Sequence, residues 1–135
     1  MLSIVDTGPL YAAADSGDAD HERCLRVLER PDLQLVIPTM VVAEATYLIG
    51  LRLGARAEGA FLRGLAGFDV AGPAPDDWAR MADLVDRYAD FPLGGTDASV
   101  IALAERLGTE MVITLDRRHF GAVRPRHCQL FQLLP

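Results

Sequence analysis

Short apolar runs alternate along the chain with longer segments in which apolar residues recur every three or four positions. The short runs are typical of buried strands and lie at residues 2–5, 33–37, 68–71, 111–115 and 129–134. The longer segments are typical of amphipathic helices and lie at residues 18–29, 39–53, 55–65, 75–90 and 97–107. Strands that alternate with helices pair in parallel through crossover connections. We therefore expect an α/β fold, a three-layer α/β/α sandwich around a central, mainly parallel sheet of about five strands.

Three aromatic residues, Trp78, Tyr88 and Phe91, fall at near-helical spacing in and after the segment 75–90. Aromatic side chains at such spacing are more often part of a core than platforms for stacked bases. We therefore expect them to pack inside the protein. After the strand at 111–115, the sequence DRRHF is expected to turn away from the sheet.

The length of 135 residues fits a single domain, residues 1–135. Half of the residues are apolar and 24% are charged, which excludes an intrinsically disordered chain. No apolar run approaches the roughly 18 residues that cross a bilayer, and no basic segment precedes Asp6 as in a secretion signal. We expect a soluble, cytoplasmic protein without a membrane partner, in which Cys24 and Cys128 are ordinary reduced thiols.

Charge is unevenly placed along the chain. The formal net charge is −6, from 19 acidic and 13 basic side chains. All 13 basic residues are arginines, so mechanisms that need a lysine are excluded. Residues 117–135 hold four of these arginines and no acid. This basic tail is a candidate contact for an anionic partner.

Glu44 stands out in the helix predicted at 39–53. The neighbours on its own helical face are Met40, Val41, Tyr47 and Leu48. Because an unpaired buried carboxylate is costly, such a glutamate is expected to face a cation or hydrogen-bond donors. The alternative is a helix rotated so that Glu44 lies at the edge of the apolar stripe.

Three aspartates lie where strands end or helices begin. Asp6 and Asp116 each follow an apolar strand, and Asp97 opens a helix next to Thr96. Each position has an ordinary explanation, since aspartate favours turns, helix N-caps and first helical turns. In a parallel sheet, however, these strand ends and this helix start meet at the edge where α/β domains bind ligands.

Together, the four acids predict a cation site. Carboxylates gathered at one edge repel one another and raise some of their pKa values unless a multivalent cation is bound. A cluster of carboxylates without Cys or His favours Mg²⁺ or Mn²⁺. Such ions activate water and stabilise the oxyanions of a phosphodiester under attack. We therefore expect phosphodiester hydrolysis assisted by one or two Mg²⁺ or Mn²⁺ ions.

The same residues carry a family resemblance. Asp6-Thr7 after the first strand, Glu44 in VVAEATYL, Asp97 in TDASVIALAERLG and Asp116 in VITLDRRHF together resemble the PIN domain, most closely the VapC-type toxin ribonucleases. The resemblance covers essentially the whole chain, in order. It implies a PIN-like fold and a metal-dependent endoribonuclease that leaves 5′-phosphate and 3′-hydroxyl ends. By this resemblance, the acidic quartet consists of Asp6, Glu44, Asp97 and Asp116.

The resemblance also implies partners. Members of this family are usually homodimers that are inhibited by a cognate VapB-type antitoxin, whose peptide occupies the groove. The chain departs from the pattern at Gly8, where many relatives carry a small hydroxyl residue. Thr7 is the candidate to supply that hydroxyl. Asp90 is expected to be structural rather than a further acid of the site.

Arg117 and Arg118 directly follow the fourth acid and belong to the basic tail with Arg124, Arg126 and His119. The guanidinium group suits phosphate oxygens, so Arg117 and Arg118 are candidate RNA contacts. The alternative is that they face solvent or pair with surface acids. His21 and His127 are expected to have no catalytic part.

Other functions fit parts of the pattern. A response-regulator receiver or a haloacid-dehalogenase-type phosphatase also places Asp and Mg²⁺ at strand ends, but both normally use a lysine, and this chain has none. In a catalytically silent interaction module, the acids would lower stability without a metal to offset their repulsion. The closest alternative is a PIN nuclease that acts in RNA processing and is not a toxin.

Overall fold

The computed structural model describes residues 1–135 and contains one five-stranded sheet in which every neighbouring pair is parallel. The strands are β1 (Leu2–Val5), β2 (Gln34–Pro38), β3 (Asp69–Ala71), β4 (Met111–Ile113) and β5 (Gln132–Leu134). Their order across the sheet is β3-β2-β1-β4-β5, so β1 lies in the centre. The predicted parallel sheet of about five strands is confirmed.

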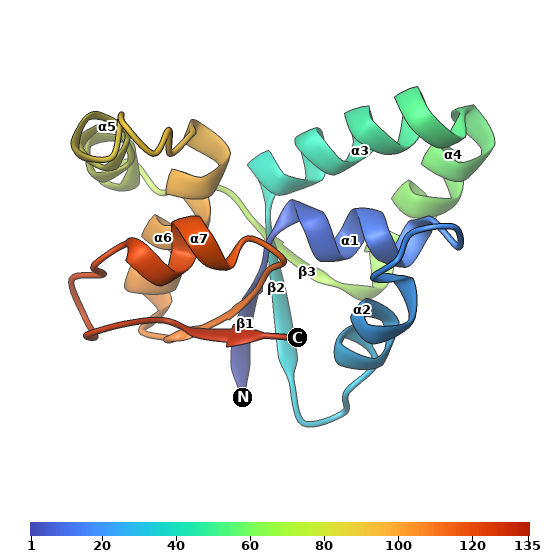
Figure 1. The fold of residues 1–135 in the computed structure, drawn as a ribbon, viewed down its shortest axis with the longest axis horizontal. Coiled ribbons are helices and arrows are strands. Elements are labelled where there is room, and N and C mark those ends of the chain that lie inside the picture. Colours follow the sequence, from blue (N-terminus) through green and yellow to red (C-terminus); the bar gives the residue numbers. More distant parts are fainter.

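Helices connect the strands and cover both faces of the sheet. They are α1 (Thr7–Ala14), α2 (His21–Leu28), α3 (Thr39–Leu53), α4 (Ala55–Gly64), α5 (Asp77–Arg87), α6 (Gly95–Leu107) and α7 (Arg117–Ala122), with a short 3-10 turn at Leu65–Gly67. Figure 1 shows α1 to α4 together on one side of the sheet and α5 to α7 on the other. This arrangement is the predicted three-layer sandwich. No helix combines the length and apolar character that a membrane crossing requires.

The central strand β1 and its neighbour β4 are buried on both faces. Ile4 and Val5 of β1 and Val112 and Ile113 of β4 are fully inaccessible to solvent. Neither face of such a strand needs polar residues, which explains why these segments are continuous apolar runs in the sequence. The core therefore fixes the two strands whose ends carry Asp6 and Asp116.

The predicted core position of Trp78 is wrong. Its side chain is 55% exposed on α5, because this helix turns Met81 and Leu84 toward the core instead. Tyr88 and Phe91, which follow the helix, are half-buried and stack edge to face with ring centres 6.1 Å apart.

The C-terminal part differs from the prediction in two ways. The sequence DRRHF forms the short helix α7, which Asp116 caps and which inserts the fully buried Phe120 into the core. The last strand is restricted to Gln132–Leu134 instead of 129–134, because its only neighbour, β4, offers three residues for pairing.

Two ion pairs fasten α5 to α6, the helix that carries Asp97. The Arg80 guanidinium donates to both carboxylate oxygens of Glu105, with the shortest N–O distance at 2.8 Å. The Arg106 guanidinium donates to Asp77 at 2.9 Å. The bidentate contact of Arg80 with Glu105 and the single contact of Arg106 with Asp77 restrict the relative orientation of the two helices, so the helix that carries Asp97 is held in place.

Replacing Gly108 with alanine is expected to lower the free energy of unfolding by about 1 kcal/mol. Gly108 ends α6 in the left-handed region, at φ 69°, where a Cβ atom is strained. A Cβ at this position would meet no atom within 4 Å, so the expected cost arises from the backbone alone. Urea denaturation in the presence of EDTA measures the change.

Gly64, the last residue of α4, provides the matched control. It has ordinary helical backbone angles, and an added methyl group would also meet open space there, so alanine is expected to raise stability slightly. Equal effects of Gly108→Ala and Gly64→Ala would contradict the backbone explanation.

Candidate functional site

The four predicted acids line one open cleft of about 470 Å³. The residues around it are Asp6, Thr7, Gly8, Glu44, Leu48, Asp97, Leu115 and Asp116. They follow β1 and β4 or belong to α1, α3 and α6. Figure 1 shows the starts of α1 and α3 together at the ends of β1 and β2. The cleft therefore lies at the carboxyl edge of the sheet, where the topology brings the acids together.

Asp6 is the most deeply buried of the four acids, with 6% of its surface exposed. It follows β1 directly, and its backbone N–H donates to the Ile113 carbonyl of β4 at 2.9 Å. Burial raises the pKa of Asp6 from its ordinary value of 3.8 to about 6, although a hydrogen bond from Thr114 opposes the rise. Without a cation, the charged form of Asp6 is thus less favourable in the cleft than it is in water.

Thr7 has a buried hydroxyl group that forms no hydrogen bond. Nearly all buried polar groups in proteins have a partner, so the Thr7 hydroxyl is available to a water molecule or a bound group beside the cleft. Next to it, a Cβ atom on Gly8 would come within 3.4 Å of the Leu115 side chain. This is an ordinary contact distance, so the structure has room for a Cβ atom at position 8, and the hydroxyl group of this turn belongs to Thr7.

Thr114 links two of the acids, a role that the sequence did not reveal. Its hydroxyl donates to Asp6 at 2.8 Å and accepts the backbone N–H of Asp116 at 2.9 Å. The sequence contained one signal for this role, a polar residue near the end of the apolar run MVITL. It became interpretable only once β1 and β4 were known to be neighbours.

Asp97 lies in the first turn of α6, beside the other acids. Burial raises its pKa, and the negative charges of Asp116 and Glu44 raise it further. The pKa values of Asp6 and Asp97 are thus both raised, mainly by burial and to a smaller extent by the neighbouring carboxylates. Asp90, in contrast, is exposed and does not line the cleft.

Asp116 has a different environment, because it caps α7. One carboxylate oxygen accepts the backbone N–H of His119 at 2.9 Å, and the other makes a short contact with the Nδ1 atom of the His119 ring. Burial would raise the pKa of Asp116, but the hydrogen bonds from His119 outweigh it and lower the pKa. The same contact raises the pKa of His119.

Glu44 lines the cleft from α3 but is exposed. The apolar stripe around it is partly open to solvent, since Tyr47 is 66% exposed. The alternative expectation is therefore correct: the helix is rotated so that Glu44 lies at the edge of the stripe, where its carboxylate faces the cleft without a desolvation cost.

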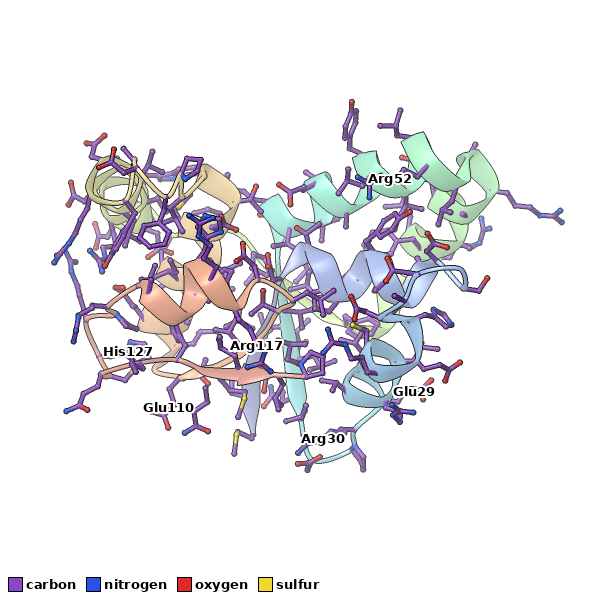
Figure 2. The ribbon with its side chains drawn as sticks, viewed as in Figure 1. Glu29, Arg30, Arg52, Glu110, Arg117 and His127 are labelled. Carbon is purple, nitrogen blue, oxygen red and sulfur yellow. The ribbon has the colours of Figure 1, made fainter.

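Arg117 and Arg118 are exposed and lie outside the lining of the cleft. The Arg117 guanidinium donates to the carbonyl of Pro135, and Figure 2 shows this side chain beside β5. The Arg118 guanidinium lies over the Phe91 ring, 5.9 Å from its centre. Neither guanidinium forms an ion pair with an acid of the cleft.

The residues around the cleft fit a hard cation that is bound partly through water. Its polar side chains are four carboxylates and the Thr7 hydroxyl, with no sulfur or imidazole ligand. No three His, Cys, Asp or Glu side chains are arranged closely enough to surround one ion directly. Mg²⁺ usually binds through one or two carboxylates and keeps several water molecules, so the chemistry of these side chains suits it.

Solved structures of toxins have the same fold. VapC20 from Mycobacterium tuberculosis, a sarcin-ricin loop cleaving toxin, aligns with a TM-score of 0.75 and 22% identity, covering 82% of this chain and 86% of that one. VapBC2 from Rickettsia felis, bound to a DNA fragment from its promoter, aligns with a TM-score of 0.72 and 14% identity over 100% of both chains.

Comparison of sequences identifies the family. The family model for the PIN domain matches residues 3–124. Ribonuclease VapC26 from Mycobacterium tuberculosis is 37% identical over 134 residues, which cover 98% of this chain and 99% of the relative. Since the family model spans most of the chain and the relative aligns over nearly its full length, this protein belongs to the PIN domain family and, within it, to the VapC group.

Proposed function

We propose that this protein is a Mg²⁺- or Mn²⁺-dependent endoribonuclease and the toxin of a VapBC-type toxin–antitoxin pair. The observation that carries the proposal is the cleft itself, in which four carboxylates and an unpartnered hydroxyl meet at the carboxyl edge of the sheet. The full-length similarity to ribonuclease VapC26 supports RNA as the substrate. We place its activity in the cytoplasm.

In this proposal, Asp6, Asp97 and Asp116 hold one or two cations, directly or through water. Glu44 supplies a fourth carboxylate from α3. A bound Mg²⁺ or Mn²⁺ supplies activation of water and stabilises charge on the phosphodiester oxygens. The Thr7 hydroxyl, free to donate and accept, orients a water molecule in the cleft.

Arg117 and Arg118 are proposed to contact RNA phosphates outside the acid cleft. Their side chains are exposed and directly follow the fourth acid in the sequence, at the start of α7. In this proposal, the two arginines offset the repulsion between RNA and a chain of net charge −6.

A VapB-type antitoxin is the proposed protein partner. The solved relative from Rickettsia felis is a VapBC complex, and a toxin–antitoxin complex from Klebsiella pneumoniae has the same fold, with a TM-score of 0.68. This chain has a mostly apolar groove of about 390 Å³, lined by α1, α2 and α4. An apolar groove of this kind suits the apolar face of a peptide helix. We further propose that the toxin is a homodimer, as its family usually is.

Mapping of new 5′-phosphate RNA ends tests the proposal. Expression of the wild-type chain without an antitoxin is expected to produce discrete new ends, because the proposed hydrolysis leaves the phosphate on the downstream fragment. Expression of Asp97→Asn at the same level is expected to produce none. Absence of new ends with the wild type would contradict a nuclease function and favour a silent interaction module.

The same experiment separates a toxin from a PIN nuclease in RNA processing. A toxin is expected to arrest growth when it is expressed alone, and coexpression of an antitoxin encoded beside it is expected to restore growth. Discrete cleavage without arrest would favour the processing nuclease.

A further inference from the structure

We propose that His119 is a positioning residue that holds the Asp116 carboxylate in place and ties it to the segment leading to Asp97. This inference rests on the proposed cation site and assigns a role to a side chain outside the acidic quartet.

The first observation is that His119 contacts both carboxylate oxygens of Asp116. The backbone N–H of His119 donates to Oδ1 at 2.9 Å, as an ordinary helix N-cap requires. The ring atom Nδ1 contacts Oδ2, which capping does not require. A carboxylate held through both oxygens is unable to rotate about its χ2 bond, so its remaining lone pairs keep a fixed direction.

The second observation concerns the other side of the imidazole ring. Its Nε2 atom lies 3.2 Å from the carbonyl oxygen of Phe91, and the two rings stack edge to face with centres 5.6 Å apart. Phe91 lies in the connection that enters α6, whose first turn carries Asp97. The ring of His119 therefore bridges the helix that follows Asp116 and the connection that precedes Asp97.

The other two histidines of the chain lack this arrangement. The Nδ1 atom of His21 contacts the Ala12 carbonyl at 2.8 Å, and Nε2 of His127 contacts the Thr109 carbonyl at 2.7 Å. Neither forms an ion pair with an acid or lines the cleft. The contact with a carboxylate is thus specific to His119 and does not follow from a general need to satisfy buried imidazole.

A fixed carboxylate is valuable in a cation site. Hydrogen bonds to ligating carboxylates orient them, and loss of such a partner typically lowers metal affinity about 10- to 100-fold. Asp116 has the most exposed environment of the three aspartates in the cleft, with a side chain 36% accessible. Without the His119 ring, only the backbone N–H of residue 119 would hold the carboxylate, through Oδ1, and Oδ2 would lose its contact and its tie to the segment that leads to Asp97.

Isothermal titration of the full-length chain with Mn²⁺, without RNA, tests this role. His119→Ala is expected to weaken Mn²⁺ binding about 10-fold or more. His119→Asn is expected to restore most of the affinity, because its amide nitrogen occupies the place of Nδ1 and donates to Asp116. His127→Ala, the matched control, is expected to bind Mn²⁺ as the wild type does.

Thermal unfolding in EDTA distinguishes positioning from a purely structural role. If His119→Ala unfolds at a lower temperature but binds Mn²⁺ with wild-type affinity, the positioning role is wrong. If the alanine variant does not fold, His119→Leu takes its place, since leucine fills the space against Phe91 without a donor. If the wild-type chain binds no Mn²⁺, the proposed cation site is wrong and so is this inference. If the wild type binds Mn²⁺ and the His119 variant binds it equally well, only this inference is wrong.

Discussion

Replacing Asp97 with asparagine is expected to lower the rate of RNA cleavage roughly 1,000-fold. The two side chains have nearly the same shape, but asparagine lacks the negative charge that the cleft offers to a cation. Asp97 lines the cleft with the other three acids, and burial raises its pKa. Without a cation, its charged form is therefore disfavoured in the cleft, and a bound cation would stabilise it. Single-turnover cleavage of a labelled RNA with Mn²⁺ measures the loss.

Asp83→Asn is the matched control for this prediction. Asp83 is exposed on α5 and does not line the cleft, so the same chemical change there is expected to alter the rate by no more than about twofold. Comparable losses in the two variants would indicate a general effect of charge on RNA binding. Full activity of Asp97→Asn would mean that Asp97 serves only the first turn of α6.

The position of the site was predictable because two strong patterns coincide. The apolar runs before Asp6 and Asp116 are continuous, as in strands buried on both faces, and the structure buries Ile4 and Ile113 completely. Parallel strands place their carboxyl ends at one edge. The identity of the strands and their parallel pairing were therefore sufficient to predict that Asp6, Asp97 and Asp116 meet at one edge of the sheet.

The surroundings of the acids were not predictable, because they depend on tertiary contacts. Helix α3 has apolar residues on much of its surface, so helical periodicity alone did not decide which way Glu44 points. The structure places Glu44 at an exposed edge. Likewise, the six residues of α7 are too few to carry a clear amphipathic pattern, so the contact of His119 with Asp116 was not visible in the sequence.

Without a divalent metal, replacing Asp6 with asparagine is expected to raise the free energy of unfolding at pH 8 by roughly 3 kcal/mol. Burial raises the pKa of Asp6 to about 6 in the folded chain, whereas an unfolded chain has the ordinary value of 3.8. The folded state therefore binds the proton more tightly. Proton binding at Asp6 therefore stabilises the folded state. This stabilisation is complete below about pH 4, falls as the pH rises toward and through about 6, and is absent at pH 8.

Urea denaturation in EDTA between pH 4 and 8 measures this effect. In the wild type, the free energy of unfolding is expected to decline with rising pH in part because Asp6 titrates. The asparagine variant should lack this part of the decline, because its side chain does not titrate. Its amide oxygen still accepts the hydrogen bond from Thr114. The difference between the variant and the wild type is thus expected to grow with pH. A variant less stable than the wild type by several kcal/mol at pH 8 would show that Asp6 is structural.

Addition of Mn²⁺ is expected to reverse the order of stability. A cation that binds the folded chain stabilises it in proportion to the logarithm of its concentration above the dissociation constant. The wild-type chain, with a charged Asp6 in the cleft, should gain this stabilisation, and Asp6→Asn should gain much less of it. The curves of unfolding free energy against Mn²⁺ concentration should therefore cross. Parallel curves would mean that the charge of Asp6 is unfavourable with or without a cation, and the proposed cation site would be wrong.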